Sequence, residues 1–161
     1  MPRITANNAG GLNRCAFLDM VAFSEIGAAL LKETDDGYNV LVGATSARPL
    51  TFSGYATHPN WFNKACNSTA AGRYQLLHRY FVFYADLLAL SDFSPESQDK
   101  IALQQIKERG ALAHIDAGDF STAVQLCSNI WASLPGNTYG QHQNTLAYLQ
   151  LAYQQAGGTV A

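Results

Sequence analysis

Between residues 15 and 27 the hydrophobic positions recur with the period of an α-helix. At about 100° per residue, the apolar side chains that share one arc are Phe17, Leu18, Val21 and Ala22. Glu25 falls inside the same arc, and Gly27 suits the end of the helix. The pattern therefore predicts a core helix with one carboxylate in the last turn of its apolar face.

A carboxylate at that position is unusual, because removing an unpaired charge from water is costly. Burial and the negative end of the helix dipole both favour the protonated form, so we expect the pKa of Glu25 to be raised. A carboxyl group that stays protonated near neutral pH is what a general acid needs. The alternative is a structural Glu that reaches water or pairs with an arginine.

The pattern changes after this first helix. Residues 34–37 carry a turn signal, and the β-prone run 38–43 follows it. The chain then becomes rich in Gly, Ser, Thr, Asn and Pro, with short strand-like pieces and no helical period. We therefore predict a small, irregular antiparallel sheet lobe over roughly 36–57, and a loop over 58–71 that returns to a helical body.

The rest of the chain predicts further helices. Aromatic and Leu residues lie all round the helix predicted over 76–90, which indicates a central buried helix. Ser94, followed by a proline, is a typical N-cap for an amphipathic helix over 95–109. An Asp caps the helix over 119–131, and the last helix covers about 142–156. The whole of 1–161 is thus predicted as one α+β domain, mainly helical, with the sheet lobe beside a cleft.

Composition narrows the class of protein. The chain has 161 residues, of which 48% are hydrophobic and 14% charged, with a net charge of −2. This balance does not favour a nucleic-acid partner, and no run approaches the roughly 18 apolar residues of a membrane span. Residues 1–11 lack the apolar core of a signal peptide, so we expect synthesis in a cytoplasm.

Cysteine and histidine spacing indicates neither a disulfide framework nor a metal site. The three cysteines are widely spaced free thiols in this interpretation, with Cys15 and Cys127 in core helices and Cys66 in an accessible loop. The four histidines are expected to face solvent or to cap helices: His58, His78, His114 and His142. No cofactor and no metal are predicted, since phosphate-binding, dinucleotide-binding and zinc-binding motifs are all missing.

The span 37–85 contains no Asp or Glu. The basic residues within it are Arg48, Lys64, Arg73 and Arg79. This pattern is either chance in a polar segment or a cleft wall that tolerates an anionic polymer and offers no second carboxylate. A helix-end Glu that faces a small sheet lobe across a cleft is how a lysozyme-like site is built.

Several segments also resemble one known family. They are 16–20, 24–25, 72–77, 92–95, 102–112, 128–136, 139–141 and 156–160. These blocks are similar to the lambda-type phage endolysins. The resemblance implies a lysozyme-like fold and a lytic transglycosylase that cuts peptidoglycan between N-acetylmuramic acid and N-acetylglucosamine. It also implies a phage or prophage origin, and a protein that stays in the host cytoplasm until a holin gives it access to the cell wall. We expect a monomer.

The resemblance also assigns roles to residues. Glu25 matches the catalytic Glu of the family. The substrate-binding residues that it suggests are Ser24, Tyr38, Asn39, Arg73, Tyr74, Gln75, Tyr139 and Gln141. Asn39 stands where an Asp is expected, and the segments that show little likeness are 1–13, 26–36, 44–71 and 142–155.

The number of carboxylates then predicts the mechanism. Glycoside hydrolases of the common types use two carboxyl groups, and the span 37–85 supplies none. Glu25 would then act twice, first as acid and then as base, and close a 1,6-anhydro ring on the muramoyl sugar. The alternatives are a hydrolytic lysozyme that uses Asp35, Asp36 or Glu33 as second carboxylate, and a wall-binding module without activity.

Overall fold

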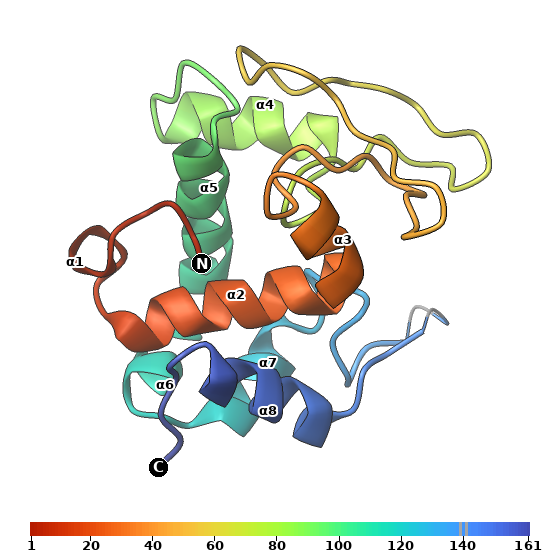
Figure 1. The fold of residues 1–161 in the computed structure, drawn as a ribbon. Coiled ribbons are helices and arrows are strands. Elements are labelled where there is room, and N and C mark those ends of the chain that lie inside the picture. The colour runs from red at the N-terminus through yellow and green to blue at the C-terminus, as the bar shows by residue number, and fades with distance from the viewer. Residues whose placement is uncertain (139, 141) are drawn as a thin grey trace.

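The computed structural model describes residues 1–138, 140 and 142–161. Its helices are α1 (Ala6–Ala9), α2 (Leu12–Ile26), α3 (Ala28–Glu33), α4 (His78–Leu87), α5 (Pro95–Glu108), α6 (Leu112–Asp116), α7 (Phe120–Cys127) and α8 (Leu146–Gln155). A lobe of turns and short bridges lies between α3 and α4, above the body formed by the other helices (Figure 1). No helix in the described ranges is long and apolar enough to cross a bilayer.

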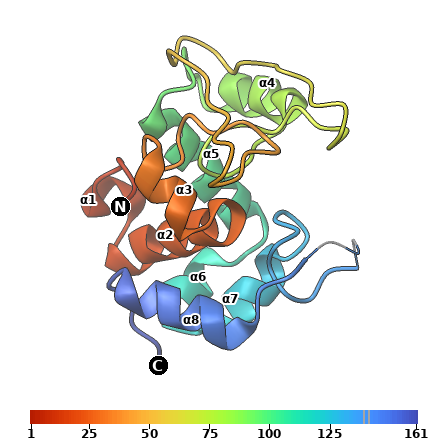
Figure 2. The same ribbon diagram turned by 45° about the vertical axis from the view of Figure 1, so that its right-hand side comes forward.

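The central element is α2, as the sequence predicts. It contacts α1, α3, α5, α6 and α8, and both ribbon views show it in the middle of the body (Figure 2). Eight of its 15 residues are buried. Phe17 packs edge-on against Phe120 and Tyr153, with ring centroids 6.3 and 6.4 Å apart. The Phe17 side chain alone is worth about 3–5 kcal/mol of stability against truncation to Ala.

The helix predicted as central and buried over 76–90 lies instead on the surface, as α4. Phe81 and Tyr84 are buried, while Val82, Phe83 and Leu87 are exposed. The prediction was wrong because an apolar run shows which side chains prefer burial and not how many faces of the helix find a neighbour. Here α4 packs against α5 on one side and leaves the opposite side in solvent.

The lobe is less regular than a sheet and extends further than predicted. Its pairing consists of isolated antiparallel bridges, which are Val40–Thr51, Leu41–Ala71, Thr45–Arg48, Asn63–Ser68 and Ala71–Leu76. Three of these bridges use residues beyond 57, so part of the predicted loop over 58–71 belongs to the lobe. Side chains supply the remaining support, since the Asn63 amide donates to the Val42 carbonyl at 2.9 Å. The structure thus confirms the helices of the predicted α+β class, whereas the predicted sheet is represented only by isolated bridges.

Helix ends follow their local signals more closely. The Ser94 hydroxyl accepts the N–H of Ser97, and the Asp119 carboxylate accepts that of Thr122, so both predicted caps are confirmed. The helix after Asp119 ends earlier than predicted, at Cys127, and α8 begins four residues later than predicted. Short α1, α3 and α6 carry too few periodic positions to be found by their pattern.

A buried carboxylate joins the lobe, α5 and the N-terminal segment. Asp99 of α5 is fully buried and accepts four hydrogen bonds. The donors are the backbone N–H groups of Arg3 and Ile4, at 2.8 Å each, and the hydroxyls of Tyr38 and Tyr74, at 2.8 and 2.6 Å. Because every donor comes from outside α5, this single group fixes three parts of the chain relative to one another.

Arg73 forms a second buried polar cluster. Its guanidinium pairs with Asp19 of α2 and with Asp36, and it lies 5.1 Å from the centre of the Tyr38 ring. The preceding Gly72 has φ +79°, and a Cβ there would lie 2.2 Å from Gln98 Oε1. The turn over 72–75 therefore needs both its glycine and its arginine for packing.

His58 corrects another prediction. The ring is only 2% exposed, whereas we expected it to face solvent or cap a helix. Nε2 donates to the Leu76 carbonyl at 2.9 Å, and Nδ1 accepts the Asn60 N–H at 3.0 Å. Burial lowers the pKa of His58 to about 4, so the ring is neutral near pH 7.

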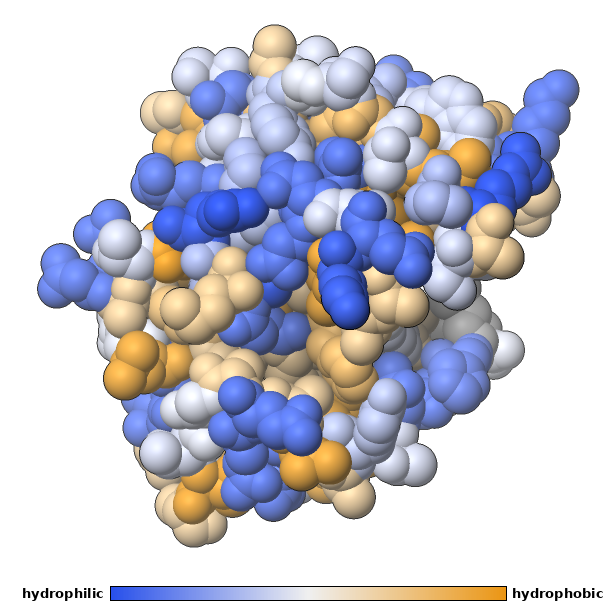
Figure 3. Space-filling view, viewed as in Figure 1, coloured by the Kyte–Doolittle hydropathy of each residue, from blue (hydrophilic) through white to orange (hydrophobic). Residues whose placement is uncertain are grey.

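The cysteines lie where the sequence placed them, with Cys15 and Cys127 buried and Cys66 exposed. On the face shown in Figure 3, hydrophilic and hydrophobic groups alternate in small areas.

Candidate active site

A cavity of about 900 Å³ separates the lobe from the helical body. Its floor is the end of α2, and one wall is formed by the lobe segments 40–44 and 74–77. Side chains of α4 and α5 and the segment 129–132 close the other sides. The predicted cleft is therefore present, at the junction between the two parts of the fold.

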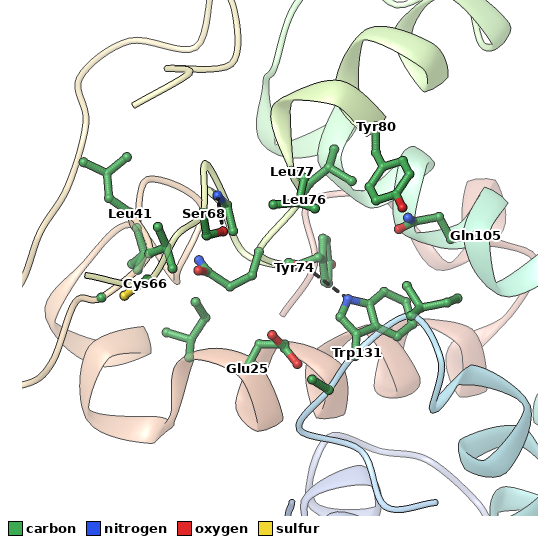
Figure 4. A pocket seen from close by; sticks show the side chains of 18 of the residues that line it. Glu25, Leu41, Cys66, Ser68, Tyr74, Leu76, Leu77, Tyr80, Gln105 and Trp131 are labelled. Carbon is green, nitrogen blue, oxygen red and sulfur yellow. Dashed lines mark hydrogen bonds between the residues drawn. The ribbon is translucent and has the colours of Figure 1, made fainter. Parts of the chain in front are cut away.

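Glu25 lies on the floor of this cavity. Its carboxyl group points from α2 into the space below Tyr74 and beside Trp131 (Figure 4). Among the described residues that line the cavity, it is the only carboxylate. Burial raises the pKa of Glu25, and the hydroxyl and backbone N–H of Ser133 partly oppose this shift because they favour the ionised form.

The hydrogen-bond partners of Glu25 come from the distant segment before α8. Ser133 Oγ donates to Glu25 Oε1 at 2.5 Å. Ser24 Oγ lies 2.7 Å from Ser133 Oγ, and Asn144 Nδ2 donates to Ser24 Oγ at 3.0 Å. Sequence reasoning missed both Ser133 and Asn144. Ser133 lies in the endolysin-like segment 128–136 but received no role there, and Asn144 lies in the segment 142–155, which shows little likeness to the family. Ser24 was predicted to touch substrate, but it lies behind Glu25 and does not line the cavity.

Two of the predicted substrate-binding residues do line the cavity with Glu25. The Tyr74 carbonyl accepts the Trp131 indole N–H at 3.1 Å, while the Tyr74 hydroxyl turns away toward Asp99. Gln75 has φ +48°, and its amide donates to the Gly72 carbonyl at 2.9 Å. The turn thus places Tyr74 and Gln75 in the lining of the cavity, and contact with substrate at both stays a prediction.

The positions of three other predicted residues argue against contact with substrate. Tyr38 and Arg73 are fully buried and belong to the polar clusters around Asp99 and Asp19. Asn39 Oδ1 accepts the backbone N–H of Asp35 at 3.1 Å and lies outside the cavity lining. These positions support the walls of the site and do not face it. Tyr139 and Gln141 lie outside the described residues.

The candidate second carboxylates are engaged elsewhere. Asp35 pairs with Arg3 at 2.8 Å and accepts the Tyr55 hydroxyl at 2.5 Å. Asp36 pairs with Arg73 at 2.8 Å and with the Met1 ammonium at 3.1 Å. Neither of them lines the cavity, and neither does the exposed Glu33.

The charged groups at the cavity, apart from Glu25, are cationic. Arg79 of α4 and Arg109 after α5 both line it and both are exposed. The acid-free span 37–85 therefore does form a wall of the site. Among the described residues, the site holds one half-buried acid and two exposed cations. Such a cavity suits a long, polar and anionic substrate.

A helical body with a helix-end carboxyl group facing a small irregular lobe defines a lysozyme-like protein. A model of the family described as Endolysin matches residues 15–160, and the chain belongs to that family. It is 50% identical to the endolysin of Escherichia phage lambda over 151 residues, which is 91% of this chain and 92% of the relative. It is 45% identical to the endolysin of Escherichia phage P2 over 157 residues, which is 92% and 95% of the two chains.

Solved structures give the same result. Bacteriophage lambda lysozyme complexed with a chitohexasaccharide matches with a TM-score of 0.86 and 47% identity. Lysozyme from bacteriophage lambda matches a second time with a TM-score of 0.81 and 46% identity. Each match covers 100% of both chains. The lysozyme-like fold is therefore confirmed over the whole chain.

Proposed function

We propose that this chain is a lytic transglycosylase that cleaves the β-1,4 bond between N-acetylmuramic acid and N-acetylglucosamine in peptidoglycan. The observation that carries the proposal is that Glu25 stands as the lone carboxylate among the described residues of the cavity. Membership of the endolysin family supports the cell wall as substrate. The relative solved with a chitohexasaccharide supports a glycan chain as the occupant of the cavity.

The reaction begins with Glu25 as general acid. The raised pKa favours the protonated form of its carboxyl group, which gives its proton to the glycosidic oxygen as the bond to C1 breaks. The leaving N-acetylglucosamine departs with a free 4-hydroxyl group. Positive charge develops at C1 of the muramoyl sugar, where the 2-acetamido group of the substrate stabilises it.

Glu25 then acts as general base. Its carboxylate removes the proton from the C6 hydroxyl of the same muramoyl sugar while that oxygen attacks C1. The product carries a 1,6-anhydro ring, no water is consumed, and Glu25 is protonated again. Proximity favours the C6 hydroxyl over water, because the attacking group is already part of the bound sugar.

Hydrolysis of the common types requires a second carboxyl group. That group lies roughly 5–5.5 Å from the acid in retaining enzymes and roughly 6.5–9.5 Å away in inverting ones. Asp35 and Asp36 form ion pairs outside the cavity, so they are poorly placed for either role. The geometry therefore supports the single-carboxylate reaction.

The products test this proposal. Purified peptidoglycan is digested and the released muropeptides are analysed by mass spectrometry. We expect every cut to leave an anhydromuramoyl end, lighter by one water than the hydrolysed product, with no rise in reducing ends as the wall clears. Abundant reducing N-acetylmuramic acid ends would instead require a second carboxylate, and binding without any cleavage would indicate a wall-binding module.

The biological setting follows from the same proposal. The endolysins of phages lambda and P2 are relatives of this chain, which supports lysis of the bacterial host at the end of infection. We infer that the protein acts as a monomer and reaches the wall through a holin.

A further inference from the structure

Glu25 is backed by a line of three polar side chains that no part of the proposed reaction uses. Asn144 Nδ2 contacts Ser24 Oγ, Ser24 Oγ contacts Ser133 Oγ, and Ser133 Oγ contacts Glu25 Oε1, at 3.0, 2.7 and 2.5 Å. None of these three residues lines the cavity. They join the end of α2 to a segment more than 100 residues away in the sequence.

When Glu25 is ionised, as in its role as base, the protons along this line have one consistent order. A serine hydroxyl has a single proton, and an ionised carboxylate can only accept. Ser133 therefore uses its proton on Glu25, and Ser24 must use its own on Ser133. The Asn144 amide then fills an acceptor position on Ser24.

The first donor of the line is itself held in place. Asn144 Nδ2 also lies 3.4 Å from the Ser24 carbonyl, and the backbone N–H of Asn144 donates to the Ser133 carbonyl at 2.9 Å. These contacts fix the Asn144 amide with its NH₂ group toward Ser24. If Ser133 donated to Ser24 instead, the Ser24 hydroxyl would accept two hydrogen bonds and its own proton would have no acceptor among these three side chains.

We propose that Asn144, Ser24 and Ser133 are positioning residues that form a directed hydrogen-bond relay and deliver one donor to Oε1 of Glu25. The inference rests on the proposed role of Glu25 as acid and then base. With Oε1 occupied by the Ser133 hydroxyl, the transferable proton resides on Oε2. The relay thus determines which oxygen atom of Glu25 gives the proton to the glycosidic bond and later accepts one from the C6 hydroxyl.

The relay also balances the two proton states that the reaction needs in one turnover. Burial favours the protonated acid, whereas a donor at Oε1 favours the carboxylate that serves as base. Ionisable groups that line the cavity from the other elements are Cys66, Tyr74, Arg79, Tyr80, Tyr84 and Arg109. The causes of the pKa shift at Glu25 are burial and Ser133, and none of these groups contributes.

Four variants test the relay: Ser133→Ala, Ser24→Ala, Ser24→Thr and, as a matched control, Ser128→Ala. Ser128 is a buried serine after α7 whose hydroxyl donates to the Gln125 carbonyl, away from Glu25. Initial rates on purified peptidoglycan are measured against pH. The titration of Glu25 is followed by NMR on protein with a ¹³C-labelled Glu carboxyl group, which requires no activity.

Loss of the Ser133 donor should raise the pKa of Glu25 and move the alkaline limb of the pH profile to higher pH. The sign follows because the first step needs the protonated acid, and a carboxylate without its donor holds its proton more tightly. We expect kcat to fall by about 10- to 100-fold with little change in KM. Ser24→Ala should act in the same direction with a smaller effect, Ser24→Thr should restore the hydroxyl and the profile, and Ser128→Ala should leave both unchanged.

Three results would overturn the relay. They are an unchanged Glu25 titration in Ser133→Ala, a fall in rate that is uniform across pH, and a rise in KM that indicates substrate contact. If Ser133→Ala does not fold, the pair Ser24→Ala and Ser24→Thr decides the question. The proposed function fails separately, by an active Glu25→Gln variant, and the NMR titration still measures the relay in that case.

Discussion

The Tyr74 hydroxyl donates to Oδ1 of Asp99 at 2.6 Å, and this bond ties a residue that lines the cavity to the interior of α5. Tyr38 donates to the same oxygen atom, and two backbone N–H groups donate to the other. The wall of the site is thus anchored on a buried carboxylate that itself never faces the substrate.

Replacing Asp99 by Asn should lower the free energy of unfolding by about 2–4 kcal/mol, because an amide NH₂ group would then face hydrogen-bond donors. Urea denaturation measures the loss. Glu96→Gln is the matched control, since Glu96 is exposed in the first turn of the same helix and its replacement should cost less than about 1 kcal/mol. An Asp99→Asn protein as stable as the parent would show that the buried network does not hold the lobe.

Exchange of Glu25 for Gln keeps the size of the side chain and removes its titration. We expect a loss of activity of at least about 10²–10⁴-fold, since one group performs both proton transfers. Zymograms and turbidity assays on cell walls measure it, with circular dichroism to confirm folding. Glu33→Gln, on an exposed residue outside the cavity, should retain full activity. A Glu25→Gln variant with a tenth of the parental rate would refute the assignment.

The neutral His58 should make stability depend on pH. Its pKa is lowered from 6.5 to about 4 in the folded protein, so the unfolded chain binds a proton first as the pH falls. The contribution of the neutral His58 to the free energy of unfolding is therefore complete above pH 6.5. It is lost as the pH falls toward 4, by roughly 3 kcal/mol in total. Denaturation at several pH values measures this slope. His58→Gln should flatten the slope, and His142→Gln, at an exposed position, should not. If His58→Gln showed the same dependence of stability on pH as the parent, the dependence would come from other titratable groups.

Thiol chemistry should separate the three cysteines. Cys66 is exposed and lines the cavity, whereas burial raises the pKa of Cys127 to about 12 and also raises that of Cys15. A colorimetric disulfide reagent should therefore label one thiol quickly in the native protein and two more after unfolding. Labelling should also slow glycan cleavage, and Cys66→Ser should abolish the fast phase. Fast reaction at Cys127 would mean that α7 is packed differently.

Local signals explain what the sequence could predict. The period of α2 and the caps at Ser94 and Asp119 depend on neighbours within a few residues, and all three are confirmed. The burial of α4 was predicted wrongly because it depends on which distant elements cover its faces. Glu25 could be found because a charge on an apolar helix face is anomalous in the sequence itself.

The remaining parts of the site depend on distant contacts. Ser133 reaches Glu25 across 108 residues and Asn144 reaches Ser24 across 120, so no spacing rule links them. Arg73 and Tyr38 stand beside residues of the site in the sequence, but their side chains turn into the core. Proximity along the chain could not distinguish residues that line the cavity from residues, such as Arg73 and Tyr38, that support its walls.

The isolated bridges of the lobe make it tolerant of changes in loop length. A regular ladder ties each strand to its neighbour residue by residue, and an insertion would shift the register of the whole sheet. Here the backbone is joined at scattered points such as Val40–Thr51 and Asn63–Ser68, so the turns between them can lengthen or shorten at a small entropic cost. One wall of the cavity can therefore change in loop length while α2 keeps its acid in place.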